Sequence, residues 1–148
     1  MAVVTTDIAQ AILEERLIGR WYTMVEIGDW WRLAFSDGLW LVAQCLTAPE
    51  ESDLRSHLAS SPHMLLDGID PEDIPVAVAV LRNRRQRVRG LDLAPDGTLA
   101  MHFENEATLL CPSSTPATDW QWAINLTGTD PYNDYTVACF RPEEIHAL

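Results

Sequence analysis

Apolar and polar residues alternate with period two along two stretches of the chain, 21–45 and 87–111, as they do in half-buried β-strands. Turn residues interrupt each alternation: Gly28-Asp29 and Ser36-Asp37-Gly38 in the first stretch, and Pro95-Asp96-Gly97 in the second. Because tight turns join antiparallel neighbours, each stretch is predicted to form a β-meander. One gap aligns the two stretches, which indicates a repeated structural unit.

The residues outside the meanders predict short helices and a closing hairpin. Residues 46–86 form a linker, in which Asp70-Pro71-Glu72-Asp73 has the composition of a helix start. Residues 74–82 after it alternate as a strand would, but the start signal favours a helix. Residues 119–148 predict a terminal hairpin. The expected fold class is therefore α+β, mainly antiparallel sheet from two related β-meanders plus a terminal hairpin, with two or three short helices.

Composition places the chain among globular proteins and gives it a strong negative charge. Its 148 residues are 47% hydrophobic and 22% charged, which predicts a single domain over residues 1–148. The 22 acidic residues outnumber the 10 basic ones, so the formal net charge is −12. This charge disfavours nucleic acid and favours a basic partner. Because the sequence shows neither a signal peptide nor an apolar run long enough for a membrane span, we expect a cytoplasmic protein.

The sequence contains no motif of a known reaction or cofactor, such as a phosphate-binding loop, a nucleophile elbow or paired metal ligands. The scattered histidines are His57, His63, His102 and His146. His102 stands between core-facing neighbours and should point outward. The widely spaced cysteines are Cys45, Cys111 and Cys139, which we expect to be buried free thiols. We predict no catalytic residue, no metal and no cofactor.

The tryptophans are the most informative apolar residues. Trp21 and Trp31 fall on the predicted inner face of the first meander, whereas Trp30 and Trp40 fall on the opposite face. Filling of the core is one interpretation. An aromatic patch on the outer face is the other, since large exposed apolar side chains mark interfaces and Trp is enriched at binding hot spots. The partner-binding candidates on this face are Trp30, Trp40, Tyr22 and Met24.

Half of the arginines fall in one short window. They are Arg82, Arg84, Arg85, Arg87 and Arg89. Three interpretations are open: a solvated helix end that the helix dipole favours, a surface that pairs with the acidic surface of another copy, and an anion-binding site for phosphate or nucleotide. The overall negative field of the protein opposes the third interpretation.

Four segments resemble one family of small bacterial proteins. They are LIGRWYTMVEIGDWWRLAFSDGLWL, VRGLDLAPDGTLAMHFENEATLLC, DWQWAINLTG and YTVACFRPEEIHAL. Together they are similar to a small uncharacterised family that is frequent in actinobacteria, whose members have two meander units, a helix between them and a closing tryptophan-containing strand. The resemblance implies a fold of two meander repeats. It implies no catalytic or binding residue, because the family has no established activity.

A second similarity concerns the lipocalins. Gly19-Arg20-Trp21-Tyr22 is similar to the G-x-W-Y signature that opens a lipocalin barrel, and Thr129-Asp130 with Tyr132 and Tyr135 is similar to a later element of that family. A lipocalin needs several strands and a helix after this later element, and here only a final strand follows. We interpret the similarity as coincidental.

These features lead to one preferred function and two alternatives. The preferred function is a non-enzymatic binding protein of the immunity or inhibitor type, whose acidic surface and aromatic patch engage a basic protein partner. The first alternative is a small-molecule or nucleotide-binding protein with a Trp-lined pocket and the Arg82–Arg89 cluster. The second is an enzyme that uses these arginines on a phosphorylated or nucleotide substrate. The aromatic face is also a candidate homodimer surface.

Overall fold

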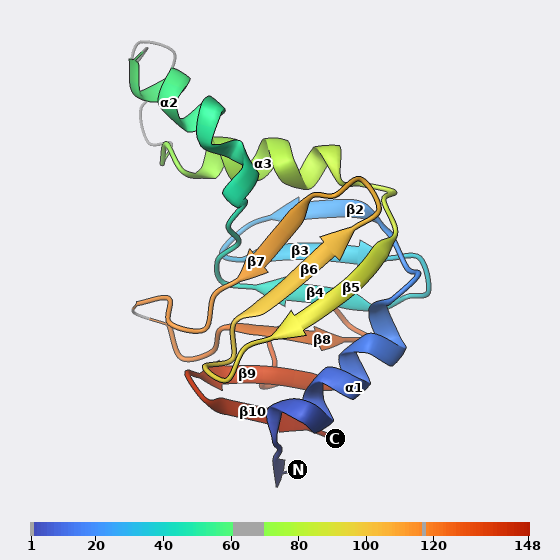
Figure 1. Cartoon of the computed structure of the whole chain (residues 1–148). Helices are drawn as coiled ribbons and strands as arrows, with labels where there is room; N and C mark the ends of the chain where they lie inside the picture. Colours follow the sequence, from blue (N-terminus) through green and yellow to red (C-terminus); the bar gives the residue numbers. More distant parts are fainter. Residues whose placement is uncertain (1, 61–69, 117) are drawn as a thin grey trace.

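The described part of the chain folds into three helices and two antiparallel β-sheets (Figure 1). The computed structural model describes residues 2–60, 70–116 and 118–148. The helices are α1 (Thr6–Leu17), α2 (Ser52–Ser60) and α3 (Asp73–Arg82), and a 3-10 turn, η1 (Pro49–Glu51), precedes α2. None of these described helices has the length and apolar character needed to cross a membrane. The α+β class predicted from the sequence is confirmed.

Seven of the described strands form a large sheet that joins the first meander to the C-terminal strands. In spatial order they are β1 (Ala2–Val3), β10 (Glu144–Ala147), β9 (Val137–Arg141), β8 (Trp122–Asn125), β4 (Trp40–Ala43), β3 (Trp31–Phe35) and β2 (Tyr22–Ile27). Every neighbouring pair is antiparallel. β4 pairs with β8, with Leu41 opposite Ile124, so two parts of the chain that are far apart in sequence meet in the middle of the sheet.

The second meander forms a separate small sheet. Its strands are β5 (Val88–Leu93), β6 (Leu99–Phe103) and β7 (Thr108–Cys111), paired in that order. Gly97 adopts a φ of +96° in the turn between β5 and β6, a conformation that favours glycine. The two meanders and the antiparallel pairing of β8, β9 and β10 confirm the predicted arrangement of strands.

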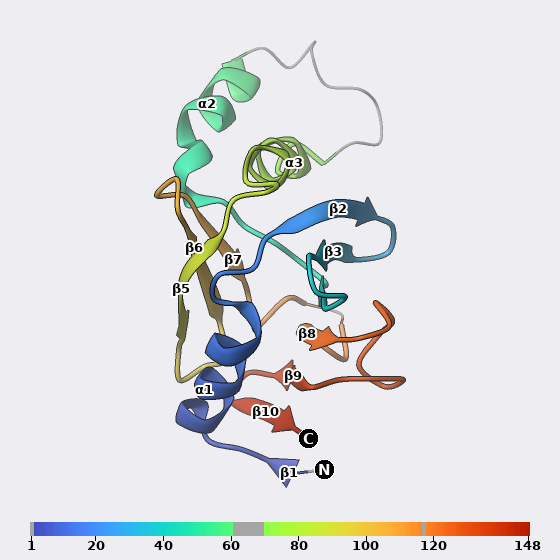
Figure 2. The ribbon, with the colours of Figure 1, turned by 90° about the vertical axis from the view of Figure 1, so that its right-hand side faces the viewer.

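The two sheets lie face to face as layers, and α1 lies beside the small sheet in the same layer (Figure 2). The helix contacts β5 as well as β9 and β10, so it covers the part of the large sheet that the small sheet leaves open. Fully buried side chains from both layers fill the space between them, including Leu33, Met101, Phe103 and Trp122. The indole N–H of Trp122 donates to the carbonyl of Gly97 at 2.8 Å, which satisfies the one polar atom of this ring.

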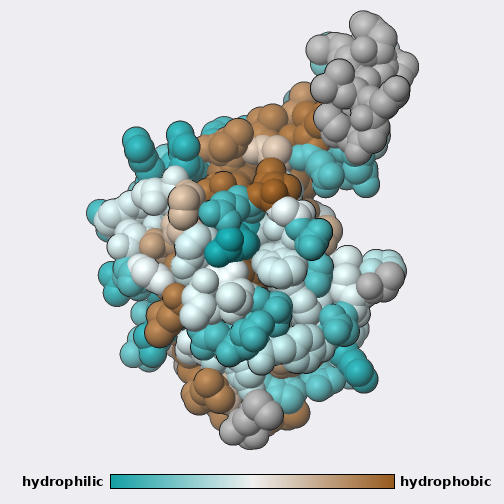
Figure 3. Space-filling view, turned by 180° about the vertical axis from the view of Figure 1, so that it is seen from behind, coloured by the Kyte–Doolittle hydropathy of each residue, from teal (hydrophilic) through white to brown (hydrophobic). Residues whose placement is uncertain are grey.

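A second apolar cluster lies on the outer face of the large sheet, away from the small sheet. Its buried members are Val42, Trp120, Ala123, Tyr135 and Ala138, and Trp30 and Phe140 pack against them. Trp120 and Tyr135 come from the loops on either side of β8, so these loops fold back over the sheet. Figure 3 shows the molecule from this side: hydrophilic residues and residues of intermediate hydropathy cover most of the surface, and hydrophobic ones gather mainly in the region of α3.

A β-bulge in β2 reverses the faces that alternation predicts for its first residues. The pairing register with β3 shifts by one residue between Tyr22 and Met24. Tyr22 therefore points into the core and is fully buried, whereas Trp21 lies outside and stacks against Arg87. The prediction that Trp21 faces the core and Tyr22 faces outward is wrong, because a one-residue shift moves each side chain to the other face and strict alternation gives no sign of it.

The linker between the meanders contains η1, α2 and α3. Because α3 spans Asp73–Arg82, the helix favoured for residues 74–82 is confirmed and the strand alternative is wrong. The carboxylate of Asp70 accepts a hydrogen bond from the backbone N–H of Glu72, so Asp70 stabilises a turn just before the helix. Residues 61–69 of the predicted linker lie outside the described residues.

Candidate functional site

The four predicted partner-binding residues do not form one patch. Trp30 and Trp40 lie half-buried on the outer face of the large sheet, as predicted, but the protein's own side chains cover them in part. Trp30 packs edge-to-face on Trp120 with 5.4 Å between ring centroids, and the guanidinium of Arg32 lies 4.5 Å from the ring centroid of Trp40. Met24 is 45% exposed on the edge strand β2. Tyr22, the fourth member of the set, is fully buried in the core.

The five arginines predicted to bind anions are spread over α3, the turn after it and β5. Their contacts are Glu51 for Arg82, Trp21 for Arg87 and Glu106 for Arg89, while Arg84 and Arg85 are exposed in the turn. The protein's own carboxylates or indole ring thus engage three of the five guanidinium groups. This geometry gives no support to a shared phosphate site at these described residues.

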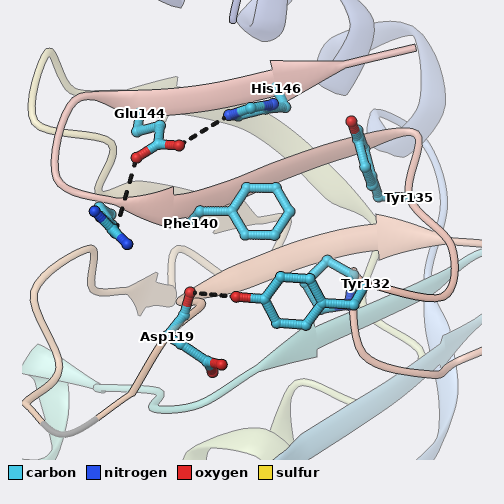
Figure 4. A pocket seen from close by; sticks show the side chains of 8 residues that line it. Asp119, Tyr132, Tyr135, Phe140, Glu144 and His146 are labelled. Atoms are coloured by element: carbon cyan, nitrogen blue, oxygen red, sulfur yellow. Dashed lines mark hydrogen bonds and ion pairs between the residues drawn. The ribbon is translucent and has the colours of Figure 1, made fainter. Parts of the chain in front are cut away.

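Aromatic and charged side chains from separate parts of the sequence gather in one pocket on the outer face of the large sheet (Figure 4). The pocket has a volume of about 380 Å³. The aromatic residues that line it are Tyr132, Tyr135, Phe140 and His146, and the other lining residues are Asp119, Pro131, Arg141 and Glu144. They come from β9, β10 and the two loops that flank β8.

Hydrogen bonds of a buried asparagine hold the loop that carries the two tyrosines. Asn125, at the end of β8, is fully buried, and its side chain makes three bonds of 2.8 to 3.0 Å to the backbone of residues 128–134. Asp130 accepts from the backbone N–H of Tyr132 at 3.0 Å, which closes a turn in the same loop. The loop therefore presents Tyr132 and Tyr135 in fixed positions beside β9.

The rings of the pocket are arranged around Phe140. Its ring centroid lies 5.4 Å from that of Tyr132, 5.9 Å from that of Tyr135 and 5.0 Å from that of His146. Phe140 and His146 project from the same face of the adjacent strands β9 and β10, while Cys139, Ile145 and Ala147 point into the core on the other face. A cluster of aromatic rings of this kind is a favourable environment for a cation, because the ring faces carry negative potential.

Two polar atoms of this cluster are buried without a hydrogen-bond partner. They are the hydroxyl oxygen of Tyr135 and Nδ1 of His146, two of the four such side-chain atoms in the described residues. Tyr135 is only 7% exposed. An unpaired buried polar atom costs free energy, and in native proteins it commonly marks a site of function. Both residues line the pocket, but the two atoms are shielded from solvent in the free protein, so a ligand supplies the missing partners as a side chain of the lining moves aside.

Carboxylates outnumber basic groups around the pocket. Asp119 and Glu144 line it together with Arg141, whose Nε lies 4.0 Å from a carboxylate oxygen of Glu144. The other carboxylate oxygen of Glu144 lies 3.1 Å from Nε2 of His146. With a neutral imidazole, the lining residues carry two negative charges and one positive charge, so the pocket is negative overall.

The two tyrosine hydroxyls of the pocket stay protonated at neutral pH. Burial raises the pKa of Tyr135 above its ordinary value. Burial, followed by the negative charge of Asp119, raises the pKa of Tyr132, whose hydroxyl donates to the backbone carbonyl of Asp119 at 3.0 Å. Tyr132 therefore has a partner for its hydroxyl, and Tyr135 has none among the described residues.

The three cysteines are free, and the two that are buried on strands β7 and β9 are unreactive. Cys111 and Cys139 are buried, as predicted, whereas Cys45 is half-buried. Burial raises the pKa of Cys111, and it raises the pKa of Cys139 to about 12. Since the thiolate is the nucleophile, neither buried thiol is suited to covalent chemistry at neutral pH.

His102 lies on the outer face of the small sheet and faces outward, as predicted. Its ring makes hydrogen bonds to Asp92 at 2.8 Å and to Thr108 at 3.1 Å, both on strands that neighbour β6. Across the described ranges, no three or more His, Cys, Asp or Glu side chains are grouped so as to hold a metal ion.

The sequence patterns do not predict the pocket. His146 is one of several scattered histidines, and Tyr132 and Tyr135 stand out only for their similarity to a lipocalin element. One signal was available, because the short segment 132–140 contains two of the three tyrosines and one of the three phenylalanines of the chain. Their convergence with His146 depends on the pairing of β9 with β10 and on the loop fold, which no local pattern specifies.

Comparisons of the chain with protein-family models, with curated proteins and with solved structures find no match. The resemblance to a small bacterial family therefore stays a prediction. The geometry of the pocket is the basis for the function proposed below.

Proposed function

We propose that this is a non-enzymatic binding protein that engages a basic protein partner, with the pocket around Phe140 at the centre of the contact. The observation that carries the proposal is the pair of unpartnered buried atoms, on Tyr135 and His146, in an aromatic pocket with a negative lining. The formal net charge of −12 attracts a basic surface, and buried aromatic rings are typical binding hot spots.

The surroundings of the pocket support a macromolecular partner. Tyr132 is 62% exposed and Arg141 is also exposed, so polar and aromatic groups at the opening are accessible. An aromatic centre surrounded by polar groups is the usual composition of a protein interface. The aromatic interface expected around Trp30 and Trp40 is thus proposed at another part of the same face, over β9 and β10.

Site-specific photo-crosslinking in cells of the native host tests this proposal. With p-benzoylphenylalanine in place of Tyr132, we expect adducts with a basic protein. The same probe in place of Leu81, which is 57% exposed on α3, serves as the control position. Since the attraction is electrostatic, the purified complex should weaken strongly between about 0.05 and about 0.5 M salt.

A second variant ties the adduct to the pocket. Phe140→Leu keeps an apolar side chain and removes the central ring, so it should abolish the adduct formed at position 132. Adducts of equal yield at positions 132 and 81, or an adduct that persists with Phe140→Leu, would contradict the proposal.

A small-molecule binding protein is the second candidate, because of the volume of the pocket. About 380 Å³ falls within the roughly 300–1,000 Å³ of small-molecule sites. This version uses the aromatic residues around Phe140, and not the tryptophans or the dispersed arginines. A small molecule that co-purifies with the wild type, and is lost with Phe140→Leu in native mass spectrometry, would favour it over a protein partner.

A further inference from the structure

The hydrogen-bonding groups of the pocket define what kind of cation fits it. Nε2 of His146 lies 3.1 Å from an oxygen of the Glu144 carboxylate. An ionised carboxylate only accepts hydrogen bonds, so Nε2 of the neutral ring carries the proton and Nδ1 presents a lone pair. The hydroxyl oxygen of Tyr135 also accepts hydrogen bonds. Both unpartnered atoms of the pocket are therefore acceptors for an N–H group.

The rings and charges are placed to surround the cation that carries such N–H groups. In Figure 4, the ring of Phe140 lies between the Glu144–His146 pair and Tyr132, and the hydroxyl end of Tyr135 points toward the strand of His146. The guanidinium of Arg141 lies 4.0 Å from the Glu144 carboxylate, and the Arg141 side chain is 76% exposed.

We propose, building on the binding function above, that the pocket takes an alkylammonium or alkylguanidinium group, the end groups of lysine and arginine side chains. The alkyl stem packs on Phe140, and the N–H donors bond to the hydroxyl of Tyr135 and to Nδ1 of His146. A quaternary ammonium has the same charge and favours the same rings, but it has no N–H and leaves both acceptors unpaired. The rings alone would bind N–H cations and quaternary ammonium groups equally well, so the hydrogen bonds are what distinguish the two.

NMR titration of the purified protein with four probes on one butyl stem tests the assignment. The probes are butylammonium, butylguanidinium, butyltrimethylammonium and butanol. We expect the two N–H cations to bind about tenfold more tightly than the quaternary one, because each of the two hydrogen bonds contributes about threefold, and butanol to bind most weakly. Shifts should be confined to resonances of the pocket.

Matched variants separate the hydrogen bonds from the rings. Tyr135→Phe keeps the ring and removes one of the two hydrogen bonds, so it should lower the preference for N–H cations from about tenfold to about threefold while leaving the affinity of butyltrimethylammonium unchanged. Phe140→Leu should weaken all three cations. Tyr132→Phe removes a hydroxyl that already has a partner, so it should leave the preference intact. Circular dichroism verifies that each variant is folded.

The outcomes keep this inference apart from the proposed function. If butyltrimethylammonium binds as tightly as butylammonium, or if the preference is undiminished in Tyr135→Phe, the inference is overturned, even where Phe140→Leu abolishes the adduct at position 132. If the N–H preference is found but no pocket-dependent protein adduct forms, the inference stands and the protein-partner function fails. The bound cation then belongs to a free amine and not to a side chain of a partner. Displacement of the captured protein by excess butylguanidinium assigns the cation to a side chain of the partner.

Discussion

Replacing Tyr135 with phenylalanine should make the protein more stable although it removes a polar group from the pocket around Phe140. The hydroxyl is buried without a partner among the described residues, and a buried unpaired hydroxyl costs about 1–3 kcal/mol. Its removal leaves a void of roughly 10–15 Å³, which costs only about 0.3 kcal/mol. The net effect is a gain of about 1–2 kcal/mol, or about 3–6 °C in Tm for a domain of this size.

Urea denaturation and calorimetry measure this gain. Tyr132→Phe is the matched control, because its hydroxyl donates to a backbone carbonyl at 3.0 Å and the residue is largely exposed, so its loss should change stability by less than about 0.5 kcal/mol. Under the inference above, Tyr135→Phe also loses affinity for N–H cations, so stability and binding change in opposite directions. A Tyr135→Phe variant with a Tm equal to or lower than that of the wild type would refute the view that this hydroxyl is unsatisfied in the free protein.

Other features of the structure lead to three further expectations. Gly128→Ala should cost about 2–4 kcal/mol of stability in urea denaturation, since φ is +71° and a Cβ would lie 2.8 Å from the ring of Trp40. The control Gly38→Ala, with a φ of +86° and nothing within 4 Å of the added Cβ, should cost only about 1 kcal/mol. Equal losses in the two variants would show that the clash with Trp40 does not contribute. Trp122→Phe removes a buried hydrogen bond and should cost about 2–4 kcal/mol, with an unchanged Tm as the contrary result. Burial raises the pKa of Cys139 to about 12, so the stability that comes from keeping this thiol neutral is complete below its ordinary pKa of 9.0 and is lost as pH rises toward 12. Between about pH 8 and about pH 10.5, the urea midpoint of Cys139→Ser should therefore fall less than that of the wild type. An identical fall in both proteins would contradict this cause.

The strands were predictable because their signals are local. Turn sequences such as Ser36-Asp37-Gly38 and Pro95-Asp96-Gly97 lie next to runs of strict alternation, and both meanders form where these patterns place them. The helix over residues 74–82 was also predictable, because a proline and acidic residues mark its start more strongly than the alternation of Val76, Val78 and Val80 marks a strand. Each of these features depends on residues that are close together in sequence.

The face of Tyr22 and the location of the pocket were not predictable for the opposite reason. A bulge is a property of the pairing between β2 and β3, and alternation within one strand does not contain it. The pocket likewise joins Asp119, Phe140 and His146 through strand pairing and loop packing. The arginines show the converse case, since residues that are close in sequence contact different partners: Arg82 pairs with Glu51 and Arg89 with Glu106.

The pairing of β4 with β8 has a consequence for how the chain reaches its native state. The whole linker and the second meander separate these two strands in sequence, so β4 remains an unpaired edge, with Leu41 and Val42 on it, until residues 122–125 have been synthesised. Pairing over such a distance is slow, and an apolar edge left open during synthesis favours aggregation. The pocket is built on strands that are added after this step. Nascent or truncated chains that have not closed the sheet therefore lack this pocket, and under the proposed function the ability to bind would report that folding is complete.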